Sequence, residues 1–76
     1  MNRKESKKEM GKLLKIQLIK IGLPQKALAK TCGVPASIVS EWACGRRDIS
    51  LKYFIRLPNI LNCSLDDLNP IAREIN

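Results

Sequence analysis

The stretch Gln25–Gly45, which reads QKALAKTCGVPASIVSEWACG, decides the fold of this 76-residue chain. Pro24 and Pro35 each open a short helical pattern, because the N–H that proline lacks has no partner in the first turn of a helix. Gly33 and Gly45 end the two patterns, since glycine readily adopts the positive φ that closes a helix. The sequence therefore predicts two short helices joined by a tight turn, with the first residues of the second helix projecting outward.

A longer helix is predicted before this stretch, from about Glu5 to Gly22. Its inward face carries Met10, Leu14, Leu18 and Ile21, and its apolar side is widened by Ile16 and Ile19. Residues 1–4 are expected to form a flexible basic tail, and residues 5–76 a single domain.

Two further helices are predicted after the stretch. Ser50 is a good N-cap for a fourth helix, which we expect to kink or break near Leu57 because Pro58 cannot continue it. The inward stripe of this helix is Leu51, Phe54, Ile55 and Leu61. Ser64 is expected to cap a short fifth helix, with Asp67 in a capping-box relation. Asn69-Pro70 interrupts that helix, and residues 71–76 are expected to form one more turn or a frayed end.

The net charge of +7 is unevenly distributed. Residues 1–30 hold nine Lys or Arg and two acids, whereas residues 31–76 hold five of each. Such an excess can attract nucleic-acid phosphates, although a Lys-rich start can also serve solubility alone. Because an outward helix fits the DNA major groove, DNA binding is the leading hypothesis.

Other classes of function lack support in the sequence. The three cysteines (Cys32, Cys44 and Cys63) form no CxxC pair, and without histidine no zinc site is expected, so they are interpreted as reduced, small apolar residues. The sequence also has no nucleophile–base pair or phosphate-cradling Gly loop, so neither an enzyme nor a cofactor is expected. No apolar run reaches the roughly 20 residues that span a bilayer, and the charged start lacks a signal region, so we expect a cytoplasmic protein.

From roughly Leu14 to Leu68 the chain resembles the Xre/Cro/cI family of phage and bacterial repressors. The resemblance lies in Gly22-Leu23-Pro24-Gln25, Leu28-Ala29, Gly33-Val34, Ser37 to Trp42, Gly45-Arg46-Arg47, Ser50-Leu51 and Ser64-Leu65-Asp66-Asp67-Leu68. It implies an all-α fold, a compact five-helix lambda-repressor-like domain. In this fold the second and third helices form a helix-turn-helix, and the third lies in the major groove.

The same resemblance implies site residues. Those expected to read bases are Ala36, Ser37, Ser40 and Glu41, and those expected to contact phosphates are Gln25, Lys26, Arg46 and Arg47. Some have simpler explanations: Gln25 can be only a polar first-turn residue, the two arginines a solvated loop, and Ser37 a partner for backbone N–H groups. Many relatives have longer polar side chains where this chain has Ala36 and Glu41, so the base-reading surface looks thin and DNA shape can add to specificity.

The implied function is a sequence-specific regulator of transcription, Cro-like or of controller type, that binds a palindromic operator in double-stranded DNA as a homodimer. We expect the fourth and fifth helices and the C-terminal segment to form the dimer contact, including Leu65, Leu68, Ile71 and Ile75. The rival hypothesis is a protein–protein interaction module on the same scaffold, such as an antitoxin-like partner-binding protein. Ala36, Glu41 and the near-neutral second half of the chain support it.

Overall fold

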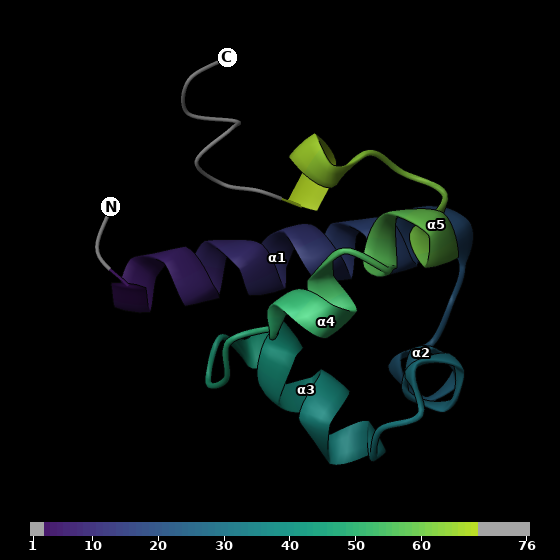
Figure 1. Ribbon diagram of the computed structural model, residues 1–76, viewed down its shortest axis with the longest axis horizontal. Coiled ribbons are helices and arrows are strands. Elements are labelled where there is room, and N and C mark those ends of the chain that lie inside the picture. Colours follow the sequence, from purple (N-terminus) through teal and green to yellow (C-terminus); the bar gives the residue numbers. More distant parts are fainter. Residues whose placement is uncertain (1–2, 69–76) are drawn as a thin grey trace.

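Helices make up the regular structure of residues 3–68, the part of the chain that the computed structural model describes (Figure 1). They are α1 (Arg3–Ile21), α2 (Gln25–Cys32), α3 (Ala36–Cys44), α4 (Leu51–Phe54), α5 (Leu57–Leu61) and the 3-10 helix η1 (Leu65–Leu68). The all-α prediction is confirmed over this range. The expected interruption at Asn69-Pro70 and the turn at residues 71–76 lie outside the described residues.

The α1 helix packs against α3 on one side and against α5 and η1 on another. Its buried residues include Leu14 and Leu18, as predicted. Its backbone is helical from Arg3, two residues before the expected start at Glu5. The apolar side predicted for this helix was too wide, because periodicity alone does not show which apolar side chains a neighbouring helix covers. The side chains of Ile16, Ile19 and Ile21 are exposed, while Leu13 and Gln17 are buried.

Gly11 lets α1 approach α3 more closely than any side chain would allow. A Cβ at this position would lie 2.6 Å from the carbonyl oxygens of both Trp42 and Ala43. Glycine inside a helix costs about 0.5–1 kcal/mol relative to alanine. Here that cost is offset by a direct backbone contact between two helices, a role that the sequence analysis did not identify.

The α2 and α3 helices pack on each other and supply much of the core (Figure 1). Gly33 ends α2 in the left-handed conformation, with φ 74°, as predicted. The Val34 N–H then donates to the Ala29 carbonyl at 3.0 Å, which closes the turn between the helices. Pro24 and Pro35 each stand directly before the first helical residue, at the N-cap position.

Pro58 breaks the predicted fourth helix into α4 and α5, with two turn residues between them. The break changes which residues face the core. Leu57 and Leu61 are fully buried, whereas Leu51 and Ile55 are 73% and 59% exposed. The predicted inward stripe is therefore wrong at Leu51 and Ile55, because it continued one helical period through the break.

The short helix η1 is capped as the sequence predicts. The backbone N–H of Ser64 donates to Asp67 Oδ2 at 3.0 Å, which is one half of a capping box. Leu68 is buried against the core, while Leu65 is exposed. Leu68 is therefore a core residue and not part of a contact surface. Ile71 and Ile75, named with it above, lie outside the described residues.

Candidate nucleic-acid interface

The outward face of α3 carries the residues predicted to read bases. Ala36, Ser37 and Ser40 are exposed, and Glu41 is half-buried. Residues three and four apart lie on one side of a helix, so Ser37, Ser40 and Glu41 form one continuous face. The exposure of these residues confirms the prediction that the start of this helix projects from the molecule.

The opposite face of α3 fixes the helix to the core. Val39 is fully buried and Trp42 is 2% exposed. The Trp42 ring lies 5.5 Å, centroid to centroid, from the Tyr53 ring of α4 at a tilt of 48°. A large aromatic ring buried in this way holds α3 at one rotation about its axis. The exposed face is therefore set by packing.

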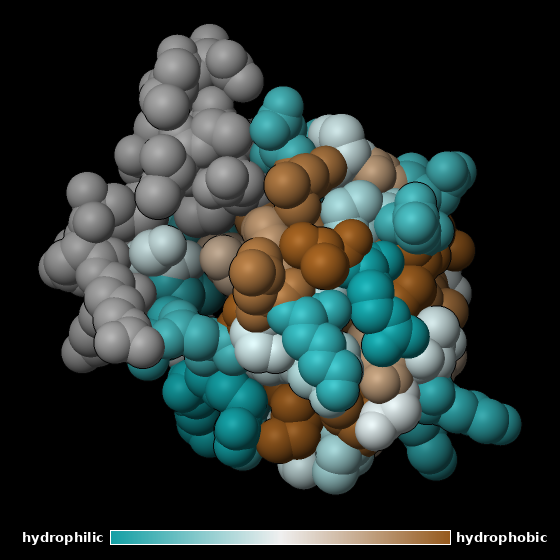
Figure 2. Space-filling view, in the orientation of Figure 1, coloured by the Kyte–Doolittle hydropathy of each residue, from teal (hydrophilic) through white to brown (hydrophobic). Residues whose placement is uncertain are grey.

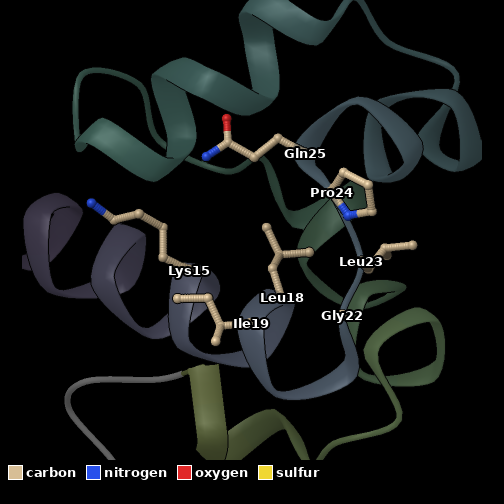
Figure 3. Close-up of a pocket in the computed structure, with 7 residues that line it drawn as sticks. All are labelled: Lys15, Leu18, Ile19, Gly22, Leu23, Pro24 and Gln25. Carbon is tan, nitrogen blue, oxygen red and sulfur yellow. The ribbon is translucent and has the colours of Figure 1, made fainter.

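The first residues of α2 lie next to α1 at the edge of an open hollow of about 450 Å³ (Figure 3). Gln25 is half-buried there and Lys26 is exposed. Leu18, Ile19 and Leu23 give the hollow an apolar lining, while the polar ends of Lys15 and Gln25 point to the same side of it. Lys15 was not predicted to belong to the site. Its position beside Gln25 depends on how α1 meets α2.

The loop between α3 and α4 carries Arg46 and Arg47, both exposed, and Figure 2 shows hydrophilic side chains gathered over it. The N–H of Arg46 donates to the Glu41 carbonyl at 2.9 Å. Arg47 Nε donates to Glu41 Oε2 at 2.6 Å, forming an ion pair between the loop and the outward face of α3. No contact between Glu41 and Arg47 was predicted from the sequence. Their contact depends on the loop conformation, which no local pattern specifies.

Cys44 is a further exposed side chain at the end of this face. It follows Glu41 by three residues and Ser37 by seven, so helical spacing places it in line with them. Cys32 is buried, and burial raises the pKa of its thiol, an effect that nearby Arg56 opposes. Burial likewise raises the pKa of the Cys63 thiol; Asp67 adds to the shift and Lys20 opposes it. All three thiols are free.

Residues 3–68 contain no group of three or more Cys, Asp or Glu side chains placed to hold a metal ion. Among the helices of the same range, none combines the length and the apolar character needed to cross a bilayer.

Comparison with known proteins identifies one family and several solved structures of similar fold. The helix-turn-helix family model matches residues 14–68. The fold is similar to that of the restriction-modification controller protein C.AhdI from Aeromonas hydrophila, with a TM-score of 0.74, 27% identity, and 82% of this chain and 94% of that chain covered. It is also similar to the hypothetical transcription factor NHTF from Neisseria, with a TM-score of 0.77 and 20% identity over 96% of this chain and 86% of that one. No curated protein sequence matches the chain.

Proposed function

The chain belongs to the Xre/Cro-like helix-turn-helix family, and on that basis we propose that it recognises a specific DNA sequence with α3 in the major groove. The family and the related controller identify it as a DNA-binding transcriptional regulator and not an enzyme. One observation carries the proposal: α3 buries Val39 and Trp42 while Ser37 and Ser40 stay exposed. A helix held in this way can enter a groove without rearrangement.

The residues proposed to meet bases are those of the outward face. Ser37 and Ser40 can donate or accept hydrogen bonds at base edges, and Ala36 can contact a thymine methyl group. This surface has short side chains. It therefore supports modest direct readout, with further specificity from the shape and deformability of the DNA.

The residues proposed to meet phosphates flank α3 on two sides. Gln25 and Lys26 stand at the start of α2, where the helix N-terminus favours an anion. Arg46 is exposed in the α3–α4 loop, and no ion pair engages it within the described part of the chain. Contacts on both sides would fix the register of α3 in the groove.

We further propose that the chain binds a palindromic operator as a homodimer. One module with so few base contacts discriminates weakly, and two half-sites multiply its selectivity. Leu51 on α4, Ile55 directly after α4 and Leu65 on η1 have exposed apolar side chains, and Figure 2 shows hydrophobic surface around α4. Burial of such side chains between two copies would stabilise a dimer. The likeness to C.AhdI favours a controller role among the regulators considered above.

Duplex binding measured by fluorescence anisotropy over a range of salt concentrations tests the proposal. We expect log K to fall with log salt by about 0.9 for each phosphate neutralised. Arg46→Ala should weaken binding to all DNA sequences alike and should make this slope shallower by about 0.9, the value of one phosphate contact. Ser37→Ala should instead change the preferred DNA sequence. Lys20→Ala is a matched control, because the exposed Lys20 side chain lies near Cys63, between α5 and η1, and does not line the hollow beside Gln25. Negligible duplex binding at ~50 mM salt would instead favour the interaction-module hypothesis.

A further inference from the structure

We infer that Glu41 does not read a base itself but positions Arg47, whose guanidinium then reads a guanine in the major groove. The inference rests on the proposed function and deepens it. Two residues thereby change role, since Glu41 was expected to read bases and Arg47 to contact a phosphate.

The loop geometry brings the two side chains together. The N–H of Gly45 donates to the Trp42 carbonyl at 3.2 Å, and that of Arg46 donates to the Glu41 carbonyl at 2.9 Å. These bonds fold the start of the loop back onto the last turn of α3. Arg47 is then the next residue, and its half-exposed side chain reaches the Glu41 carboxylate.

The ion pair is short and partly shielded. Arg47 Nε lies 2.6 Å from Glu41 Oε2, and the two side chains are 50% and 37% exposed. A charge-assisted hydrogen bond of this length restricts the rotation of the long arginine side chain. Since Glu41 shares the face of Ser37 and Ser40, the bond holds the guanidinium beside Glu41 at the end of that face.

Because Arg47 pairs with Glu41 through Nε, the N–H groups on its two Nη atoms remain as donors for a base. A guanidinium carries five N–H groups, and the four on its two Nη atoms form a fork at the far end. That fork matches the O6 and N7 acceptors of guanine, the commonest specific contact in the major groove. An arginine already held by a carboxylate would lose little further side-chain entropy on making that contact.

The charge of the pair favours a base over a phosphate as its target. Glu41 neutralises the guanidinium locally, and its carboxylate would repel a phosphate bound to the same arginine. A guanine edge carries no net charge and avoids that repulsion. Arg46 has no such partner among the described residues, so it remains the loop arginine suited to a phosphate.

A double-mutant cycle on a selected duplex tests the inference. Selection from a random DNA pool with the wild-type protein first gives the preferred site, and anisotropy then gives the affinity of each variant. We expect Arg47→Ala and Glu41→Ala to weaken binding and to lose the preference for guanine at the same position of each half-site, by roughly ten- to a hundredfold for Arg47→Ala. The double variant should bind no more weakly than Arg47→Ala alone.

Three further arms separate a positioning role from other roles. Glu41→Gln keeps an oxygen that can accept from Arg47 Nε, so it should retain part of the guanine preference. A duplex with 7-deazaguanine at that position lacks the N7 acceptor. The wild type should bind it more weakly than the unmodified duplex, whereas Arg47→Ala should bind the two duplexes equally. Arg46→Ala is the matched control, which should weaken all sequences equally while keeping the guanine preference.

Several results would overturn the inference. Glu41 would contact DNA independently if the losses of affinity caused by Glu41→Ala and Arg47→Ala multiplied in the double variant. The same conclusion would follow if the two variants changed the base preference at different positions. A reduced salt slope for Arg47→Ala with unchanged base preference would make Arg47 a phosphate contact. In both cases the wild type still binds DNA. Absence of duplex binding by the wild type would instead refute the proposed function, and the inference with it.

Discussion

Gly11 of α1 lies against the backbone of Trp42 in α3, and a Cβ at position 11 would stand 2.6 Å from the Trp42 carbonyl oxygen. Backbone atoms cannot move aside as the end of a flexible side chain can. The contact therefore sets the distance between α1 and the end of the helix that we propose enters the groove.

We predict that Gly11→Ala destabilises the protein, although alanine normally favours a helix. Overpacking costs about 1–3 kcal/mol in a well-packed core, and the obstacle here is backbone. Urea unfolding followed by circular dichroism would give the change in the free energy of unfolding. Ser40→Ala, an exposed change within α3, should leave that free energy nearly unchanged. Equal or greater stability of Gly11→Ala would show that α1 and α3 do not approach as described.

Thiol labelling should distinguish the three cysteines. We predict that a disulfide reagent labels exposed Cys44 quickly and buried Cys32 slowly, with Cys63 between them. Saturating duplex should slow the labelling of Cys44, because this thiol lies in line with Ser37 and Glu41. Cys44→Ser would identify the fast phase by removing it. Labelling of Cys44 that is equally fast with and without bound duplex would place the DNA elsewhere on the protein.

Alkaline pH should weaken the fold through Cys32. In the unfolded chain this thiol ionises near pH ~8.5, whereas burial raises its pKa in the folded protein. Below the unfolded pKa both states keep the proton, so the contribution to stability is complete. Above the unfolded pKa the thiol loses its proton in the unfolded chain but keeps it in the folded protein, so the free energy of unfolding should fall as pH rises.

The measurement is urea unfolding at several pH values between 7 and 9.5, for the wild type and Cys32→Ala. The slope attributable to one thiol is at most about 1.4 kcal/mol per pH unit. Cys32→Ala should be less stable at pH 7 but should show a shallower decline. Parallel declines for the two proteins would mean that Cys32 ionises equally easily in the folded and unfolded states.

Replacing Leu51 with lysine should weaken the proposed dimer without harming the fold. Leu51 is 73% exposed, so its replacement removes little from the core of one copy. Sedimentation velocity over a range of protein concentrations should show the wild type as a dimer and Leu51→Lys shifted toward monomer. Asn59→Lys on α5 adds the same charge at an exposed polar position and serves as the control. A wild type that stays monomeric at all concentrations would refute the homodimer.

Local rules of the sequence specify the helix ends and the helix-turn-helix. Gly33 and Gly45 end α2 and α3 in the left-handed conformation, and Pro58 splits the fourth helix, as local backbone chemistry predicts. Helical spacing also places Ser37 and Ser40 opposite Val39 and Trp42. These features follow from residues a few positions apart, and so they could be predicted.

Features that depend on tertiary contacts were missed. Ile19 and Leu51 belong to good helical stripes, yet each is exposed, because burial depends on where neighbouring helices lie. The need for glycine at position 11 and the ion pair between Glu41 and Arg47 arise in the same way. Both contacts join segments whose relative position is determined by the whole fold, so no periodicity along the chain predicts them.

In the proposed complex, DNA meets the outward face of α3 and its two flanks. Backbone amide chemical shifts, followed by NMR as the selected duplex is added to the labelled protein, would locate the bound DNA residue by residue. We predict the largest changes at Gln25, Lys26, residues 36–41 and the loop at Arg46 and Arg47. Largest changes at α5 and η1, around Asn59 and Leu65, with α3 unaffected, would contradict the account.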